Sequence, residues 1–181
     1  SGLNTKEYVA FVENFAKKCL DKGFSDDLGN YLETDSSSSG ENFYQVDIHS
    51  SADLVTWGDL SPEIYQEGIP TIKDINETTG SISMEYLISA KDAQGYQELY
   101  FVKEFYRLRY TEERIRLLDF ERTAEQIFSG SHIQVSDTGL MLGVTDRKVS
   151  YVSDKTGKSV AFVQQGDLWE YQIESNKIER I

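Results

Sequence analysis

The last part of the chain, residues 148–181, has a pattern that only a few folds can accommodate. Short runs rich in β-branched and aromatic residues follow one another there, at 149–152, 159–164, 168–173 and 177–181. Turn-forming residues separate these runs, at 154–157 and 165–167. Short strands joined by tight turns pair with their neighbours along the chain. The pattern therefore predicts an antiparallel β-meander at the C-terminal end.

Within this stretch, the run from Val160 to Val163 and the run Gly166-Asp-Leu-Trp-Glu-Tyr171 resemble a blade of the Tol-type and prolyl-oligopeptidase-type β-propellers. A propeller needs about four to eight blades, and a chain of 181 residues is too short to hold them. The strand pattern also runs up to Ile181 without a polar tail. The resemblance implies that the meander is the first blade or so of a propeller in a larger protein.

Composition and charge limit the class of protein. Hydrophobic residues make up 39% of the chain and aromatic residues 12%, as in a globular protein. Acidic residues outnumber Lys and Arg by 31 to 18, which disfavours nucleic acids and anionic membrane surfaces as partners. No apolar run is long enough for a transmembrane segment. Cys19 is the single cysteine, so no internal disulfide is expected, and it lies on an apolar helix stripe as a small core residue.

The N-terminal region predicts helices. Apolar residues at helical spacing over 5–20 indicate one buried face: Tyr8, Phe11, Val12, Phe15, Ala16 and Cys19. Asn4 and Glu7 have the spacing of a capping box at its start. Residues 25–32 predict a second short helix with Ser25 as its N-cap. A third short helix is expected to begin at Ser61–Pro62 and to end at Gly68.

The middle of the chain predicts strands. We expect strands at 43–49, at 69–75 as an edge strand next to Pro70, and at 81–90 and 96–110 as a long hairpin. A further strand pair is expected at 130–143, with a turn at 137–139. Residues 111–128 leave two alternatives open, because Leu117, Phe120, Ala124, Ile127 and Phe128 fit a helix face. Residues 114–122 also fit a returning strand, and we favour a strand for 114–120.

These elements predict an α+β fold in which an N-terminal helix packs on a curved antiparallel sheet and a C-terminal β-meander follows. We expect two domains, at 3–128 and 129–181. The element order over 5–128 resembles the cone-shaped fold of nuclear transport factors, ketosteroid isomerases and SnoaL-like cyclases, and more loosely that of cystatins. That fold hosts enzymes as well as binding domains, so the resemblance leaves the activity open.

Glu104 is the best candidate for a general base, because it shares a strand face with Tyr100, Val102, Tyr106 and Leu108. Burial there would raise its pKa. We favour the alternative that Glu104 forms a buried ion pair with one of the nearby arginines, which are Arg107, Arg109, Arg114 and Arg116. The sequence therefore assigns no catalytic residue and leaves Glu104, Tyr106 and His49 as candidates.

His49 lies near several carboxylates, with Asp47 two residues before it and Asp53 and Asp59 following. Such a histidine can act as a base oriented by a carboxylate, or as a metal ligand. We favour a half-exposed structural histidine, since a zinc site uses three or four protein ligands. No metal site and no cofactor are predicted.

Aromatic residues are the candidates for ligand contact, namely Trp57, Tyr86, Trp169 and Tyr171. Trp169 and Tyr171 lie on one face of a strand and could stack on a sugar or a peptide, although core packing within a blade is the favoured interpretation. A carbohydrate-binding module that uses Trp57 and Trp169 is a further alternative.

Taken together, the sequence favours a non-enzymatic ligand- or partner-binding accessory domain of a larger, extracytoplasmic or membrane-anchored bacterial protein. The partner is an unknown protein or small molecule. The alternative is a small cone-fold enzyme, an isomerase, dehydratase or cyclase, with Glu104 as base and Tyr86 or Tyr106 as hydrogen-bond donor. Unpaired strand edges at 159–181 also predict self-association.

Overall fold

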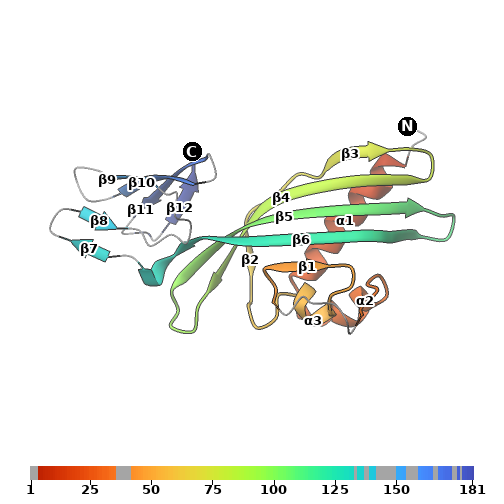
Figure 1. Cartoon of the computed structure of the whole chain (residues 1–181), viewed down its shortest axis with the longest axis horizontal. Helices are drawn as coiled ribbons and strands as arrows, with labels where there is room; N and C mark the ends of the chain where they lie inside the picture. Colours follow the sequence, from red (N-terminus) through yellow and green to blue (C-terminus); the bar gives the residue numbers. More distant parts are fainter. Residues whose placement is uncertain are drawn as a thin grey trace. The chain divides into compact units, whose positions relative to one another are not determined.

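The computed structural model describes residues 4–35, 42–132, 134–136, 139–141, 150–153, 159–164, 167–172, 175 and 177–181. It confirms an α+β fold with an N-terminal helix and antiparallel sheets (Figure 1). Two compact units form, one from Ser1–Ile88 with Phe101–Glu125 and one from Ser89–Tyr100 with Gln126–Ile181. Strands β4 (Thr79–Lys91), β5 (Gln97–Tyr110) and β6 (Ile115–Ser129) contribute residues to both units. The division into domains at 3–128 and 129–181 stays a prediction.

Helix α1 (Thr5–Cys19) confirms the predicted N-terminal helix, and its buried residues are Tyr8, Val12, Phe15, Ala16 and Cys19. The predicted capping box is wrong, because Asn4 has a left-handed backbone with φ of 61° and its side chain makes no capping hydrogen bond. The second helix is shorter than predicted. It comprises a 3-10 turn, η1 (Lys22–Phe24), and helix α2 (Ser25–Gly29), and the Asp21 side chain caps the turn by accepting from the Gly23 amide at 2.8 Å.

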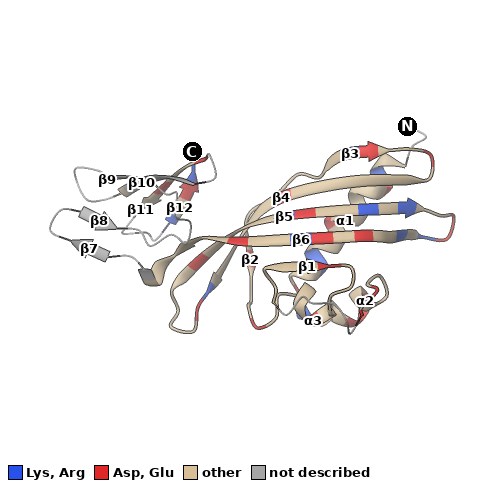
Figure 2. Cartoon of the chain, in the orientation of Figure 1, with Lys and Arg blue, Asp and Glu red and all other residues tan. Residues whose placement is uncertain are grey.

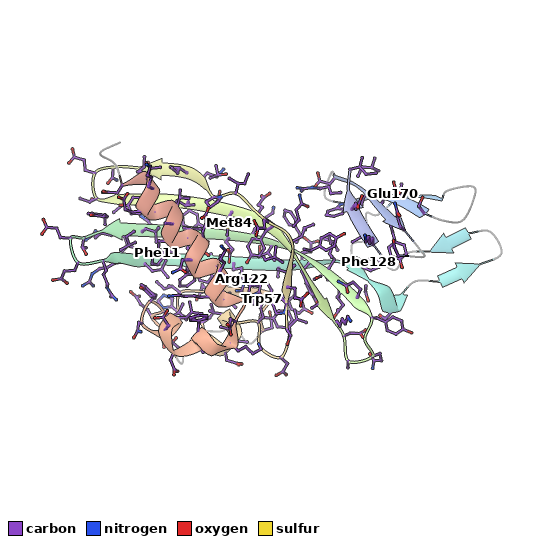
Figure 3. All side chains as sticks on the ribbon, turned by 180° about the vertical axis from the view of Figure 1, so that it is seen from behind. Phe11, Trp57, Met84, Arg122, Phe128 and Glu170 are labelled. Carbon is purple, nitrogen blue, oxygen red and sulfur yellow. The ribbon has the colours of Figure 1, made fainter. Side chains whose placement is uncertain are left out.

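The sheet of the first unit has the order β1-β6-β5-β4-β2, and β3 also pairs with β4. Its shorter strands are β1 (Gln45–Asp47), β2 (Glu63–Gln66) and β3 (Thr71–Ile75). Charged residues occur at intervals along β5 and β6 (Figure 2), as expected for strands with one face on a core. Helix α1 covers that face, with the Phe15 ring 5.7 Å from Tyr106 and 5.2 Å from Phe120 (Figure 3).

Strand β6 settles the alternatives for 111–128 in favour of a strand that runs over Ile115–Ser129. Its buried positions do not alternate strictly. Leu117 and Phe120 are both buried although they are three residues apart, and so are Ala124 and Ile127. The buried positions change from odd to even numbers between Leu117 and Phe120, and both Ile127 and Phe128 are buried near the end of the strand. This burial pattern gives the helix-like spacing that the sequence shows.

The helix predicted to begin at Ser61–Pro62 is wrong, because Glu63–Gln66 form strand β2. A short helix lies earlier, α3 (Ala52–Val55), and Ser51 caps it by accepting from the Leu54 amide at 3.3 Å. Gly68 does not end a helix; it lets the chain pass close to β4. A Cβ atom on Gly68 would lie 2.2 Å from the carbonyl oxygen of Glu85.

The second unit contains the predicted C-terminal meander. Strands β9 (Ser150–Ser153), β10 (Ser159–Gln164), β11 (Asp167–Gln172) and β12 (Lys177–Arg180) form an antiparallel sheet in the order β12-β11-β10-β9. The hairpin β7 (Gln134–Ser136) and β8 (Gly139–Met141) precedes it, after the 3-10 turn η2 (Gly130–His132). Four antiparallel strands are what one propeller blade contains, and the likeness to a blade stays a prediction. In the described part of the chain, no helix combines the length and apolarity needed to cross a membrane.

Candidate functional site

A pocket of about 160 Å³ lies in the first unit between helix α1, strands β2 and β4, and the segment after β2. The residues that line it are Glu13, Ala16, Lys17, Leu20, Ile64, Glu67, Gly68, Met84 and Tyr86. Figure 3 shows Met84 on β4 beside α1. Two small residues help to shape the pocket, because Ala16 projects little from the helix and Gly68 lets its segment lie against β4.

The pocket combines apolar walls with charged groups. Its apolar surface comes from Ala16 on α1 and Leu20 directly after it, from Ile64 on β2 and from Met84 on β4. Three exposed charged side chains lie beside this surface, namely Glu13, Lys17 and Glu67. An apolar cavity of about 150 Å³ holds a molecule the size of benzene. The pocket can therefore accept one apolar group of about the size of a leucine or phenylalanine side chain.

Glu104, the predicted candidate base, is deeply buried on β5 with 3% of its surface exposed. The Tyr106 hydroxyl donates to Glu104 Oε1 at 3.0 Å. Burial raises the pKa of Glu104 above its ordinary value of 4.5, and the Arg122 charge and the Tyr106 and Tyr86 hydroxyls oppose that rise. The Tyr86 hydroxyl is near enough to lower the pKa of Glu104, although the two groups do not have the geometry of a hydrogen bond. Glu104 is thus a buried acid that holds its proton more tightly than an exposed one.

The ion pairs predicted for Glu104 are not present in the described part of the chain. Arg107 instead donates to the Ser81 hydroxyl at 2.8 Å and to the Thr79 hydroxyl at 3.3 Å. The arginine that acts on Glu104 is Arg122 of β6, which the sequence analysis missed. A signal existed, because Phe120 and Ala124 flank Arg122 at alternate positions of a strand.

Arg122 is fully buried and ties β6 to the end of α3. It donates to the carbonyl oxygen of Val55 at 2.6 Å and to that of Leu54 at 3.2 Å. Its guanidinium lies 3.8 Å from the centroid of the Trp57 ring (Figure 3). Carbonyls at a helix C-terminus and an aromatic face both attract a cation. Trp57 has a φ of 74°, a left-handed conformation that a bulky residue rarely adopts.

Several polar groups gather around Glu104, and we call Glu104, Tyr106, Tyr86, Arg122 and Cys19 the buried polar cluster. Cys19 is fully buried and its thiol pKa is raised well above the usual range, chiefly by that burial. The thiol is therefore unreactive, as expected for a core residue. Only Tyr86 belongs to both the cluster and the pocket lining; Glu104 is not among the lining residues of the described chain.

His49 is exposed and lies just after β1 rather than on a strand. Its Nδ1 lies 3.0 Å from the Glu33 carbonyl oxygen, and this hydrogen bond is the main reason that the pKa of His49 is raised. The Asp47 carboxylate accepts a hydrogen bond from the His49 backbone amide at 2.8 Å. This carboxylate therefore stabilises the turn and does not orient the imidazole ring. No group of His, Cys, Asp and Glu that could hold a metal ion occurs among the described residues.

The four aromatic candidates fall into two separate groups. Trp57 and Tyr86 belong to the first unit, and both are buried. Trp169 and Tyr171 belong to the second unit, where they are 2% and 4% exposed. The Tyr171 ring lies 5.0 Å from that of Phe128. Of the four, Tyr86 is the one that lines the pocket.

Comparisons with protein-family models, with curated proteins and with solved structures give no match to this chain.

Proposed function

We propose that this chain is a non-enzymatic binding domain whose ligand site is the pocket between α1, β2 and β4. The observation that carries the proposal is the combination of apolar walls and exposed charged side chains at one hollow of the first unit. Binding sites typically combine an apolar surface with a few polar groups that orient the ligand. The pocket has that composition, with Tyr86 contributing an aromatic ring.

The wider setting follows from the resemblances in the sequence. We propose that the first unit is a cone-like accessory domain and that the C-terminal meander is a blade of a larger propeller. In that arrangement the domain belongs to an extracytoplasmic bacterial protein, and its task is to bind a partner or small molecule beside the propeller. The four-stranded meander β9–β12 supports the blade assignment.

Methionine labelling tests the pocket directly. The chain has two methionines, Met84 and Met141, so ¹³C-methyl labelling gives two signals that the conservative Met84→Leu variant assigns. We expect added indole, an apolar ring, to shift the Met84 signal in a saturable way, because Met84 lines the pocket. Glucose at the same concentrations is expected to leave it unchanged. A Met84 signal that stays in place up to the solubility limit of indole would refute the proposal.

An enzymatic function is the second candidate, because one observation favours it. Glu104 is a buried carboxyl with a raised pKa that accepts a hydrogen bond from Tyr106 at 3.0 Å. General bases are often tuned in this way. In the cone-fold enzyme hypothesis, Glu104 would move a proton on the substrate while Tyr86 or Tyr106 donated to its oxygen.

A β,γ-unsaturated cyclic ketone is a suitable probe of this second candidate, because its isomerisation is followed by ultraviolet absorbance. The enzyme hypothesis requires turnover by the unaltered protein and its loss in Glu104→Gln. The binding-domain proposal requires no turnover by either protein, while the indole response of Met84 persists in both.

A further inference from the structure

We propose that the occupant of the pocket is an apolar side chain of an extended, basic peptide that pairs with strand β2. This inference rests on the proposed function and names the class of its ligand. It joins three observations: an edge strand, a pocket sized for one side chain, and carboxylates around both.

Strand β2 is the last strand of its sheet in the order β1-β6-β5-β4-β2. All four of its residues, Glu63–Gln66, are exposed. In the described part of the chain no strand follows β2 in that order, so β2 is an edge strand of this sheet. An extended peptide can add to such an edge as a further strand.

The strand and the pocket share Ile64. Its side chain belongs to β2 and lines the pocket, while 40% of the residue remains exposed. A peptide paired with β2 would project alternate side chains to the face that α1 and β2 enclose. The volume of about 160 Å³ limits the occupant to one apolar side chain of leucine or phenylalanine size.

The charges around the pocket favour a basic peptide over an acidic one. Glu13 and Glu67 line it, and Glu63 and Glu85 are exposed on β2 and on the adjacent part of β4. Gly68 packs against the backbone of Glu85, so β4 and the segment after β2 lie in contact there. Lys17 is the one basic residue of the pocket lining in the described chain. Lys or Arg residues flanking the apolar anchor would therefore be favoured, and acidic flanks would be repelled.

A panel of defined peptides tests the inference by fluorescence anisotropy on the full chain. The probe is a labelled peptide in which Lys alternates with Val around a central Leu. One matched peptide carries Glu in place of Lys, and another carries Ser in place of the central Leu. We expect each replacement to weaken binding about tenfold or more, through lost charge attraction or lost apolar burial.

Matched variants of the protein locate the site. Ile64→Asp is expected to weaken binding of the Lys–Leu peptide about tenfold or more. Ile72→Asp is its control, because Ile72 is a similarly exposed isoleucine on a different strand, β3, which also pairs with β4. The pair Glu13→Lys with Glu67→Lys is expected to weaken binding, whereas Glu112→Lys with Glu113→Lys makes the same change of charge at an exposed turn and leaves binding intact.

Three outcomes would overturn the inference: no measurable binding, equal binding of the Lys and Glu peptides, or equal loss in Ile64→Asp and Ile72→Asp. The Met84 signal separates this failure from failure of the proposed function. If indole still shifts Met84 while no peptide binds, the pocket takes a small apolar molecule and the peptide inference is wrong. If neither ligand acts, both proposals are wrong.

Discussion

Replacing Arg122 with methionine should destabilise the first unit by about 3–5 kcal/mol. The variant removes two donors, to the carbonyl oxygens of Val55 and Leu54, and the stack on Trp57 at 3.8 Å. Hydrogen bonds from a charged donor contribute about 1.5–3 kcal/mol each, and a desolvated cation–π contact contributes about 2 kcal/mol. Methionine fills similar space, so its apolar contacts offset part of the loss and bring the net destabilisation below the sum of these contributions.

Urea unfolding measures this change when a single tryptophan reports on the first unit. Trp57 and Trp169 are the two tryptophans and lie in different units, so a Trp169→Phe background leaves Trp57 as the reporter. Arg107→Met is the matched control, because Arg107 is only half-buried and donates to two hydroxyls; we expect about 1 kcal/mol for it. If the free energy of unfolding of Arg122→Met lay within about 1 kcal/mol of that of the reference protein, the stabilising contact of Arg122 between β6 and α3 would be refuted.

Three further predictions concern the same unit. Folding raises the pKa of Glu104 above its ordinary value of 4.5. The stability of the unaltered protein should therefore fall relative to that of Glu104→Gln as pH rises through and above that value. Urea midpoints of the two proteins that change equally with pH would contradict this. The buried Cys19 should resist maleimide in the native protein and react once the first unit unfolds; mass spectrometry showing rapid native labelling would count against its burial. Gly68→Ala should lower the thermal midpoint and abolish the Met84 response, because its Cβ would lie 2.2 Å from the Glu85 carbonyl oxygen. In contrast, Gly29→Ala in α2 meets no atom within 4 Å and should be neutral or stabilising by up to about 1 kcal/mol, so equal thermal shifts would refute the steric reason.

The predictable part of this fold is the part with regular periodicity. Helix α1 and the hairpin of β4 and β5 follow from apolar spacing, and so does the C-terminal meander. The alternation that placed Glu104 on an apolar face also correctly implied its burial. In these elements local pattern and tertiary packing agree, which is why the sequence sufficed.

The errors occurred where tertiary contacts override local signals. Ser61–Pro62 has the features of a helix start, yet the chain there pairs with the long strand β4 as β2. Strand β6 has helix-like apolar spacing because its buried positions change parity after Leu117 and because Ile127 and Phe128 are both buried. Arg122 escaped notice because its partners are backbone carbonyls of α3, 67 and 68 residues earlier in the chain. No local pattern encodes such a contact.

The pocket itself could not be predicted. Its walls come from three elements that are far apart in sequence, and the sequence analysis identified only Tyr86 among its residues as a ligand candidate. Gly68 looked like a helix terminator, whereas its role is to permit close approach to β4. A pocket depends on where elements pack, and that information appears only in the three-dimensional arrangement.

The central claim is that the chain binds at the α1–β2–β4 pocket and does not act through Glu104. It is tested most directly by titrating indole into Ile64→Asp and Glu104→Gln side by side, with the Met84 methyl signal as readout. The account predicts that Ile64→Asp loses the response, because Ile64 lines the pocket, and that Glu104→Gln keeps it. Loss of the response in Glu104→Gln with retention in Ile64→Asp would contradict the account and place the ligand at the buried carboxyl.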